Sequence, residues 1–388
     1  MSNQNTIYLD HAATTPAREE VREAMAPFGS DVFGNPSSAH RWGRAAEAAL
    51  EEARAVVATS LGARPSEIRF VRGGTESDNL AVLGTCKALG ADGGLPTVII
   101  STIEHSAVLE PAQHLSDIGA AKLVQLSVTS GGNIDVTKIE DALTDTSPSF
   151  TSVMWANNET GTLLPVGEVT ATVQRHGGTM HSDAAQALGK VTVDVRDVPV
   201  DLLTATGHKL GGPKGMGLLF VRDGTPIRPL LYGGGQERAL RPGTQDVAGA
   251  VGLATAVHLA VRDLAEEGTR LSSLRDTLEQ ALISTLPDLR VNGADGARAP
   301  HISSIGVGGV RDGAALLMAM DLEGLAVSGG SACHSGAGKS SHVIAALYGS
   351  DDAIPTIRFS FGKTTTHQDV DRAVSITIRV VQNLRKHG

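Results

Sequence analysis

Between residues 68 and 222, short apolar runs alternate with longer segments in which apolar residues recur at helical spacing. The runs are short enough to be buried strands, and several of the intervening segments are long enough to be crossovers between parallel strands. Seven strands are predicted, at 68–71, 97–101, 122–128, 152–156, 179–183, 200–206 and 217–222. The chain therefore predicts an α/β fold, with helices covering a mostly parallel sheet.

The rest of the chain predicts a second, smaller unit. At 388 residues the chain exceeds the length at which a single hydrophobic core stops growing. A long helical stretch at 245–286, with a break expected at 266–268, leads into shorter strands at 289–291, 302–307 and 325–328, mixed with helices at 313–320, 341–348 and 367–386. We expect a smaller α+β domain there.

The charge of the chain limits its partners. The net charge of −9 is spread without a basic block, which disfavours nucleic acid and acidic membranes as principal ligands. No apolar run approaches the roughly 18 residues of a membrane span and no amino-terminal signal pattern is present, so a cytoplasmic protein is expected. The two cysteines lack the spacing of a metal site or of a disulfide framework, so each is expected to be a free thiol.

One lysine stands in a setting suited to a reactive amine. Lys209 follows the predicted strand at 200–206, has Thr206 and His208 close by, and precedes a glycine-rich turn. The glycines leave room for a planar carbonyl compound, and the two neighbours could hold a phosphate while the amine forms a Schiff base with the same ligand. Pyridoxal phosphate (PLP) fits that description. The alternative is a tight turn that carries a surface lysine.

Other polar side chains follow strands of the same predicted sheet, at the edge where open α/β sheets bind ligands. Gly74 and Thr75 open a helix after the strand at 68–71, which indicates an anion site or an ordinary helix cap. Asp183 ends the strand at 179–183. Its carboxylate could pair with the protonated nitrogen of a pyridine ring, or it could serve only as a helix cap.

Two further strand exits carry groups that suit the same cofactor. His105 follows the strand at 97–101 and could stack on a planar ring and exchange protons, although a lone histidine there is more often structural. Asn158 lies beyond the strand at 152–156. Its amide could reach a ring oxygen, or the residue could simply belong to a turn of asparagine and glycine.

Cys333 and Arg358 indicate how a substrate would be bound and attacked. Cys333 lies among small and hydrophilic residues with His334 and Lys339 nearby, so its thiol is expected to be exposed and nucleophilic. Cys86 lies in a helical apolar pattern and is expected to pack in the core. Arg358, on a predicted strand, suits bidentate capture of a carboxylate; the alternative is an arginine on the solvent face of an edge strand.

Taken together and in order, these motifs resemble those of the cysteine desulfurases, within the class V aminotransferase-like, fold type I PLP enzymes. The matching runs extend over nearly the whole chain. They are Tyr8-Leu9-Asp10 with Ala12-Ala13-Thr14-Thr15-Pro16, Gly34-Asn35-Pro36-Ser37-Ser38, Gly74-Thr75-Glu76-Ser77-Asp78-Asn79, Glu104-His105, Asn157-Asn158-Glu159, Asp183-Ala184-Ala185-Gln186, Gly207-His208-Lys209, Gly233-Gly234-Gly235-Gln236-Glu237 with Arg241-Pro242-Gly243-Thr244, Gly330-Ser331-Ala332-Cys333 and Ile357-Arg358-Phe359-Ser360. The resemblance implies a large PLP-binding domain at 16–260 and a small domain, formed by 1–15 and 261–388, that carries the catalytic cysteine loop.

The resemblance also implies roles around the cofactor ring. Lys209 would hold PLP as a Schiff base, and His105 would stack on the ring. Asp183 would pair with the pyridine nitrogen. Gln186 and Asn158 would lie by the phenolic oxygen.

Further residues would bind the phosphate and the substrate by the same resemblance. The phosphate would be held by Gly74, Thr75, Thr206 and His208. Thr244 would reach the same phosphate from the partner subunit of a homodimer. Arg358, with Asn158 beside it, would bind the carboxylate of L-cysteine, and Cys333 would attack the substrate sulfur.

This interpretation predicts conversion of L-cysteine to L-alanine, with a persulfide left on Cys333 for a sulfur-acceptor protein in iron–sulfur assembly, tRNA thiolation or DNA phosphorothioation. The alternative is a class V aminotransferase or lyase acting on another amino acid, which would have no use for Cys333. One run departs from the family pattern: Arg72-Gly73-Gly74 precedes Thr75, where a small hydroxyl residue and alanine are expected.

Overall fold

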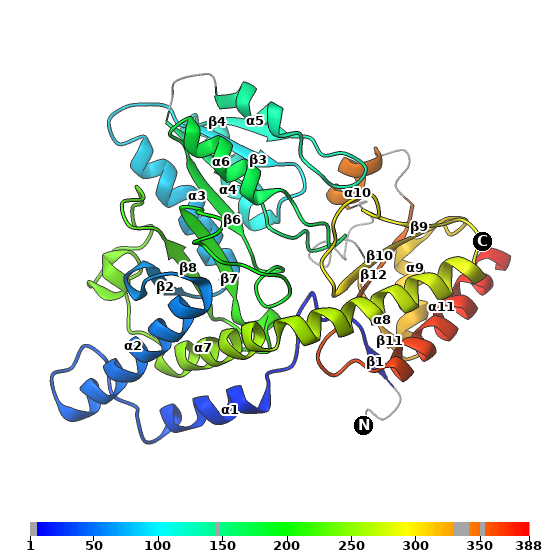
Figure 1. The fold of residues 1–388 in the computed structure, drawn as a ribbon, viewed down its shortest axis with the longest axis horizontal. Helices are drawn as coiled ribbons and strands as arrows, with labels where there is room; N and C mark the ends of the chain where they lie inside the picture. Colours follow the sequence, from blue (N-terminus) through cyan, green and yellow to red (C-terminus); the bar gives the residue numbers. More distant parts are fainter. Residues whose placement is uncertain (1–5, 144–147, 330–340, 350–353, 388) are drawn as a thin grey trace.

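The computed structural model describes residues 6–143, 148–329, 341–349 and 354–387 (Figure 1). Its largest sheet consists of β2 (Ile68–Val71), β3 (Thr97–Ser101), β4 (Lys122–Leu126), β5 (Ser149–Ser152), β6 (Thr179–Asp183), β7 (Leu202–Thr206) and β8 (Gly217–Val221). The strands lie in the order β2-β8-β7-β6-β5-β3-β4.

Most neighbours in this sheet are parallel. The strands from β7 through β6, β5 and β3 to β4 all run parallel, whereas β8 is antiparallel to both β7 and β2. The helices between successive strands are α3 (Gly74–Leu89), α4 (Ser106–Asp117), α5 (Val136–Leu143) and α6 (Val166–Arg175). The predicted α/β fold with a mostly parallel sheet is therefore confirmed.

Different helices cover the two faces of the large sheet, because successive residues of a strand point to opposite sides. Val98 and Ile100 of β3 belong to one buried cluster, with apolar residues of α3 and α4. Ile99, between them, belongs to another, with residues of α2 (Arg41–Leu61), α5, α6 and α7 (Val247–Arg262). The large sheet thus lies between two helical layers. Helix α1 (Glu19–Met25) packs beside α7.

A separate core joins the two ends of the chain, which lie on the same side of the molecule in Figure 1. It combines Ile7 and Leu9 with apolar residues of α8 (Leu264–Thr285), α9 (Gly313–Leu322) and α11 (His367–His387). Its strands are β9 (Leu289–Val291), β10 (Ile302–Val307) and β12 (Thr356–Ser360), together with the parallel pair β1 (Ile7–Tyr8) and β11 (Leu325–Ala326). This mixture agrees with the predicted α+β unit. The domain limits at 16 and 260 stay a prediction.

The long helical stretch bends at a different residue from the one predicted. Helices α7 and α8 meet at Asp263 with an angle of 73° between them. The predicted break at 266–268 is wrong, since Gly268 lies inside α8 and Asp263 is held at the corner by ion pairs with Arg18 and Lys363. In the described part of the chain no single helix is long and apolar enough to cross a membrane, and α7 and α8 meet both conditions only together, as this bent pair.

The strand predicted at 152–156 is also misplaced. β5 covers Ser149–Ser152, and three of its four residues carry hydroxyl groups. The apolar run at 153–156 has a more strand-like composition than β5 itself, which is why the sequence pattern misplaced the strand. In the structure this run is the buried connection that leads to Asn158.

Candidate active site

A cavity of about 350 Å³ opens where the parallel strands of the large sheet end. Nine of the predicted site residues line it: Gly74, Thr75, His105, Asn158, Asp183, Thr206, His208, Lys209 and Arg358. Eight of them stand at or after the carboxyl ends of β2, β3, β5, β6 and β7, and Arg358 comes from β12. Both cores of the molecule therefore contribute to one site.

Lys209 ends the 3-10 turn Gly207–Lys209, which directly follows β7. The turn is tight, because a Cβ atom at Gly207 would come within 3.1 Å of the Pro213 carbonyl oxygen. Lys209 is half-buried and also borders a second cavity of about 270 Å³. Lys190 lines that second cavity, where burial lowers its pKa to about 8. Lys209 is thus not the surface lysine of the alternative interpretation.

The amino end of α3 forms one wall of the cavity. Gly73 precedes the helix with a φ of +95°, and Gly74 and Thr75 are its first two residues. A Cβ atom at Gly217 of β8 would lie 2.7 Å from the Gly73 backbone, so strand and loop leave no room for a side chain there. Because a helix leaves its first N–H groups without intrahelical partners, this wall offers backbone donors and the Thr75 hydroxyl to an anion.

His208 stands at the same cavity with Thr206. The Nδ1 atom of His208 lies 3.2 Å from Thr14 Oγ1. Burial, followed by the charges of Lys209 and Lys214, lowers the pKa of His208 to about 4. The imidazole is therefore neutral at neutral pH and carries a single N–H donor.

His105 serves both the fold and the cavity. It caps α4, since its Nδ1 atom accepts a hydrogen bond of 3.1 Å from the Ala107 N–H. The neutral ring then carries its proton on Nε2. Burial lowers the pKa of His105, and the charge of Asp183 acts in the opposite direction. A neutral, oriented imidazole suits contact with a planar ring.

Asp183 and Asp78 bring two carboxyl groups to the cavity. Asp183 accepts a 2.8 Å hydrogen bond from the Ala185 N–H. The Oδ1 atom of Asp78 is buried and has no hydrogen-bond partner among the described residues. Burial, and then the charge of Asp183, raises the pKa of Asp78 well above its ordinary value. The two carboxyl groups therefore interact, and Asp78 holds its proton more tightly than an exposed aspartate does.

Arg358 is 2% exposed although β12 lies at the edge of its sheet, so it is not the solvent-facing arginine of the alternative interpretation. Its Nη2 atom donates to Asp10 Oδ1 and its Nη1 atom to the Asn158 carbonyl oxygen, both at 2.8 Å. Its Nε atom has no partner in the described part of the chain. The guanidinium is held in place from two sides while it lines the cavity.

Sequence reasoning assigns no role to three further groups near this site: Glu104, Glu159 and His342. Burial raises the pKa of Glu159 and of Glu104 to about 8 each. Glu159 lines the cavity and accepts a hydrogen bond from Ser341, the residue that caps α10 (His342–Tyr348). His342 also lines the cavity, and its Nε2 atom lies 3.0 Å from the Glu104 carbonyl oxygen. For Glu159 the sequence did contain a signal, because this residue directly follows Asn158 in a run that matches the family.

Two predicted residues, Gln186 and Thr244, are not among the described residues that line the cavity. Gln186 is buried behind it, where its amide donates to the Ala12 carbonyl oxygen at 2.8 Å and its Oε1 atom lies 3.2 Å from His301 Nε2. Thr244 is exposed on the segment before α7. Cys333 lies outside the described residues. Cys86 is buried as predicted, and burial raises its pKa to about 12.

The donor set of the cavity fits PLP. It offers an amine at Lys209, a carboxylate at Asp183, a neutral imidazole at His105, and hydroxyl and backbone donors at the start of α3. The buried Asp78 Oδ1 lies 3.7 Å from His181 Nε2 and accepts no hydrogen bond among the described residues, which also indicates a polar ligand. An amine, a partner for a ring nitrogen and an anion site in one cavity are typical of PLP-dependent enzymes.

Comparison with known proteins agrees with this class. The chain matches the family model for aminotransferase class-V over residues 7–373. It is 40% identical over 380 residues to "Cysteine desulfurase IscS" of Dictyoglomus turgidum, covering 98% of this chain and 95% of that protein. The chain therefore belongs to the class V aminotransferase family and, within it, to the PLP-dependent cysteine desulfurases.

Two solved structures support the same assignment. A structure titled "NIFS-LIKE PROTEIN" superposes with a TM-score of 0.89 at 35% identity, covering 97% of this chain and 100% of that one. A structure titled "SspA in complex with cysteine" has a TM-score of 0.78 at 33% identity, covering 92% and 99%. The fold predicted from the sequence is thus that of solved relatives over nearly the whole chain.

Proposed function

We propose that the enzyme binds L-cysteine in the cavity around Lys209 and transfers its sulfur to Cys333. The observation that carries this proposal is that Lys209, Asp183 and Arg358 border one cavity in a chain of this family. The relative titled as a complex with cysteine supports the choice of amino acid.

The proposed cofactor contacts follow from the donor set. When bound, PLP supplies an electron sink for the carbon atoms of the substrate. Lys209 would hold its aldehyde, Asp183 would pair with the ring nitrogen and His105 would stack on the ring. Asn158 and Gln186 would lie near its phenolic oxygen. The phosphate would be bound by Gly74, Thr75, Thr206 and His208.

The remaining groups of the cavity would bind the substrate and move its protons. Arg358 would bind the substrate carboxylate, for which it keeps a guanidinium fixed by Asp10 and the Asn158 backbone. The pKa of Glu159 is about 8, so this side chain adds no negative charge that would repel that carboxylate at neutral pH. Burial likewise raises the pKa of Asp78 well above its ordinary value. Lys209 Nζ, once free, would accept the Cα proton of the substrate.

The sulfur transfer balances without a further reactant. The Cys333 thiolate would form a bond with the substrate sulfur as the bond between that sulfur and the substrate Cβ breaks. The products would be a persulfide on Cys333 and L-alanine, so the protein thiol gains one sulfur atom and the amino acid loses it. A sulfur-acceptor protein would then take this sulfur for iron–sulfur assembly, tRNA thiolation or DNA phosphorothioation.

The thiol proposal is tested by comparing the two cysteines. We expect Cys333→Ala to lose alanine formation from L-cysteine, and Cys86→Ala, the matched control, to keep it. After one turnover without reductant, mass spectrometry should find one added sulfur atom on the peptide that contains Cys333. Desulfuration that survives Cys333→Ala would contradict the proposal and favour an aminotransferase or lyase on another amino acid.

A homodimer is proposed as well, because Thr244 is exposed rather than directed into the cavity of its own subunit. Exposed apolar side chains also flank this segment at Leu231 and Tyr232. We expect Lys209→Ala and Thr244→Asp to be inactive alone and to regain activity when their subunits are mixed, since each mixed dimer would have one intact site. Mixing that restores nothing would contradict a contribution from the partner subunit.

The proposed location is cytoplasmic. It agrees with the charge and composition of the chain. Fractionation of cells that produce the protein tests it, and recovery in the membrane fraction would contradict it.

A further inference from the structure

The unusual Arg72 does not line the proposed cofactor cavity. It lies two residues before α3, and its Nη1 atom forms a 2.9 Å ion pair with Asp246 Oδ2. Asp246 caps α7 by accepting a hydrogen bond from the Gly249 N–H at 2.8 Å. Arg72 thus connects the start of α3 to the segment 233–246, which precedes α7.

Glu76 makes a second, better shielded connection to the same segment. Its Oε1 atom lies 2.9 Å from Arg241 Nε, with only 25% and 18% of the two side chains exposed. Its Oε2 atom accepts the Arg72 N–H at 2.6 Å. Glu76 directly follows Thr75, so one carboxylate links the segment 233–246 to the loop that would cradle the phosphate.

The segment itself follows a strained path. Glu237, Arg238 and Ala239 have φ values of 45°, 57° and 60°, which is the left-handed region, where non-glycine residues cost roughly 1–3 kcal/mol each. Such a conformation persists only where surrounding contacts impose it. The segment must therefore be anchored.

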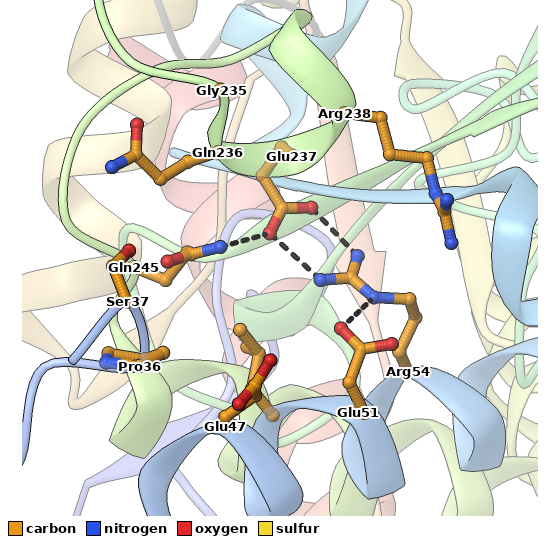
Figure 2. Close-up of a pocket in the computed structure, with 11 residues that line it drawn as sticks. Pro36, Ser37, Glu47, Glu51, Arg54, Gly235, Gln236, Glu237, Arg238 and Gln245 are labelled. Carbon is orange, nitrogen blue, oxygen red and sulfur yellow. Dashed lines mark hydrogen bonds and ion pairs between the residues drawn. The ribbon is translucent and has the colours of Figure 1, made fainter. Parts of the chain in front are cut away.

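Figure 2 shows the anchor, beside a depression of about 490 Å³. The Glu237 carboxylate accepts two hydrogen bonds from Arg54, one from Nη1 at 2.7 Å and one from Nη2 at 2.9 Å. It also accepts hydrogen bonds from Gln245 Nε2 at 3.3 Å and from the Phe70 N–H at 2.8 Å. Arg238, by contrast, points away from this pair (Figure 2). The side chains of Arg54 and Glu237 are 4% and 1% exposed. This buried pair holds the segment against the large sheet next to β2.

We propose that Arg241 and Glu76 are positioning residues for the cofactor phosphate. The buried Arg54–Glu237 pair fixes the strained segment, and Arg241 on that segment fixes Glu76, which keeps Gly74 and Thr75 in place for the phosphate. Arg72 supports the same contact from the exposed side. This inference rests on the proposed phosphate site at Gly74 and Thr75.

The test compares PLP with pyridoxal, which lacks the phosphate. Full-length protein freed of cofactor by hydroxylamine is titrated with each compound, and binding is followed by fluorescence. For Arg241→Met we expect the Kd of PLP to rise about tenfold, as for loss of one partly buried ion pair, with the Kd of pyridoxal unchanged. Arg241→Lys should recover part of the loss.

The control is Arg175→Met, which removes an arginine from the Arg175–Glu140 pair, 2.8 Å long, between α6 and α5. These two helices cover the face of the large sheet opposite to α3. It should leave both dissociation constants at their wild-type values. If wild-type protein binds PLP no better than pyridoxal, the proposed phosphate site fails. Wild-type protein that prefers PLP would support the phosphate site. If Arg241→Met then weakens the binding of PLP and pyridoxal equally, or weakens neither, only the positioning role of Arg241 is contradicted.

A double variant separates positioning from simple charge screening. Arg241→Met leaves the Glu76 carboxylate unpaired near the phosphate, and the resulting repulsion could by itself weaken binding. In Glu76→Gln with Arg241→Met that repulsion is gone but the connection is still broken, so we expect PLP affinity to stay low. A return to wild-type affinity in the double variant would show that Arg241 only neutralises Glu76, and would overturn the inference.

Discussion

The Arg54 region and the Lys209 cavity each contain a buried arginine paired with a carboxylate, but the two guanidinium groups differ in how fully they are bonded. Arg54 uses Nε, Nη1 and Nη2 to contact Glu51, Glu237 and the Ile68 carbonyl oxygen. Arg358 contacts Asp10 and the Asn158 backbone, and its Nε atom has no partner in the described ranges. An arginine whose three nitrogen atoms all donate hydrogen bonds within the protein stabilises the fold. An arginine that keeps an N–H group without a protein partner beside a cavity is suited to bind a ligand.

The carboxyl groups of the two regions differ as well. Burial by itself would raise the pKa of Glu237, but the hydrogen bonds and charge of Arg54 outweigh it and the pKa is lowered. Around the cavity, burial raises the pKa of Glu104 and Glu159 to about 8. The Arg54 region therefore contains a fixed ion pair, whereas Glu159, which lines the cavity, adds no charge at neutral pH and leaves room for the charges of a cofactor and a substrate.

The largest effect on stability is expected from breaking the buried Arg54–Glu237 ion pair. Arg54→Met leaves Glu237 buried and unpaired, so the free energy of unfolding should fall by about 3–5 kcal/mol. Urea unfolding measures this loss. At saturating PLP, the KM for L-cysteine should stay at its wild-type value, and a KM that rises with little loss of stability would contradict the division between the two arginines.

For Arg358, the arginine of the cavity, we expect a loss of activity rather than a loss of stability. Arg358→Lys keeps a positive charge near Asp10 but loses the bidentate fork, so kcat/KM for L-cysteine should fall about 100-fold, equivalent to about 2–3 kcal/mol. Steady-state kinetics and urea unfolding on the same preparation test this prediction. A variant that loses stability but keeps kcat/KM would assign Arg358 to the fold.

A smaller effect, of about 1.4 kcal/mol per pH unit at most, should distinguish the acids of the two regions. Glu104 holds its proton more tightly in the folded state, so its contribution to stability is full below the unfolded pKa of about 4.3 and is lost as pH rises toward 8. Relative to wild type, Glu104→Gln should therefore gain stability between pH 5 and about 8.

Glu237 should behave in the opposite way, because its folded pKa is lowered. Its contribution is full above the unfolded pKa of about 4.3 and is lost as pH falls through the folded value. The destabilisation caused by Glu237→Gln should thus be largest near neutral pH and shrink in acid. Urea unfolding across this range tests both variants, and parallel pH profiles would contradict the comparison.

The elements with strong local patterns could be predicted from the sequence. The limits of β2, β3, β6 and β10 agree with the predicted ranges, because the sequence pattern of these strands coincides with burial there. The prediction was wrong at β5, where hydroxyl residues fill a buried strand, and at the α7–α8 corner, where ion pairs between distant residues fix Asp263. Local composition does not encode such contacts.

Some residues of the candidate site could likewise be predicted from the sequence, and others could not. Residues that follow strands, such as Asp183 and Lys209, could be located because parallel strands end at one edge of the sheet. The role of Arg54 could not be inferred, since Glu237 lies 183 positions away and only the folded chain brings the two together. The raised pKa of Asp78 likewise depends on burial and on the charge of the nearby Asp183.

The most direct test of the proposed function is the identity of the lysine that holds PLP, because Lys190 has a lowered pKa and lines the second cavity that Lys209 borders. The purified holoenzyme is reduced with borohydride, digested and mapped by mass spectrometry. The account predicts the reduced cofactor on the peptide that contains Lys209, and a Lys190→Met protein that still gains this label. A label on Lys190, or a Lys209→Ala protein that is labelled as fully as wild type, would contradict it.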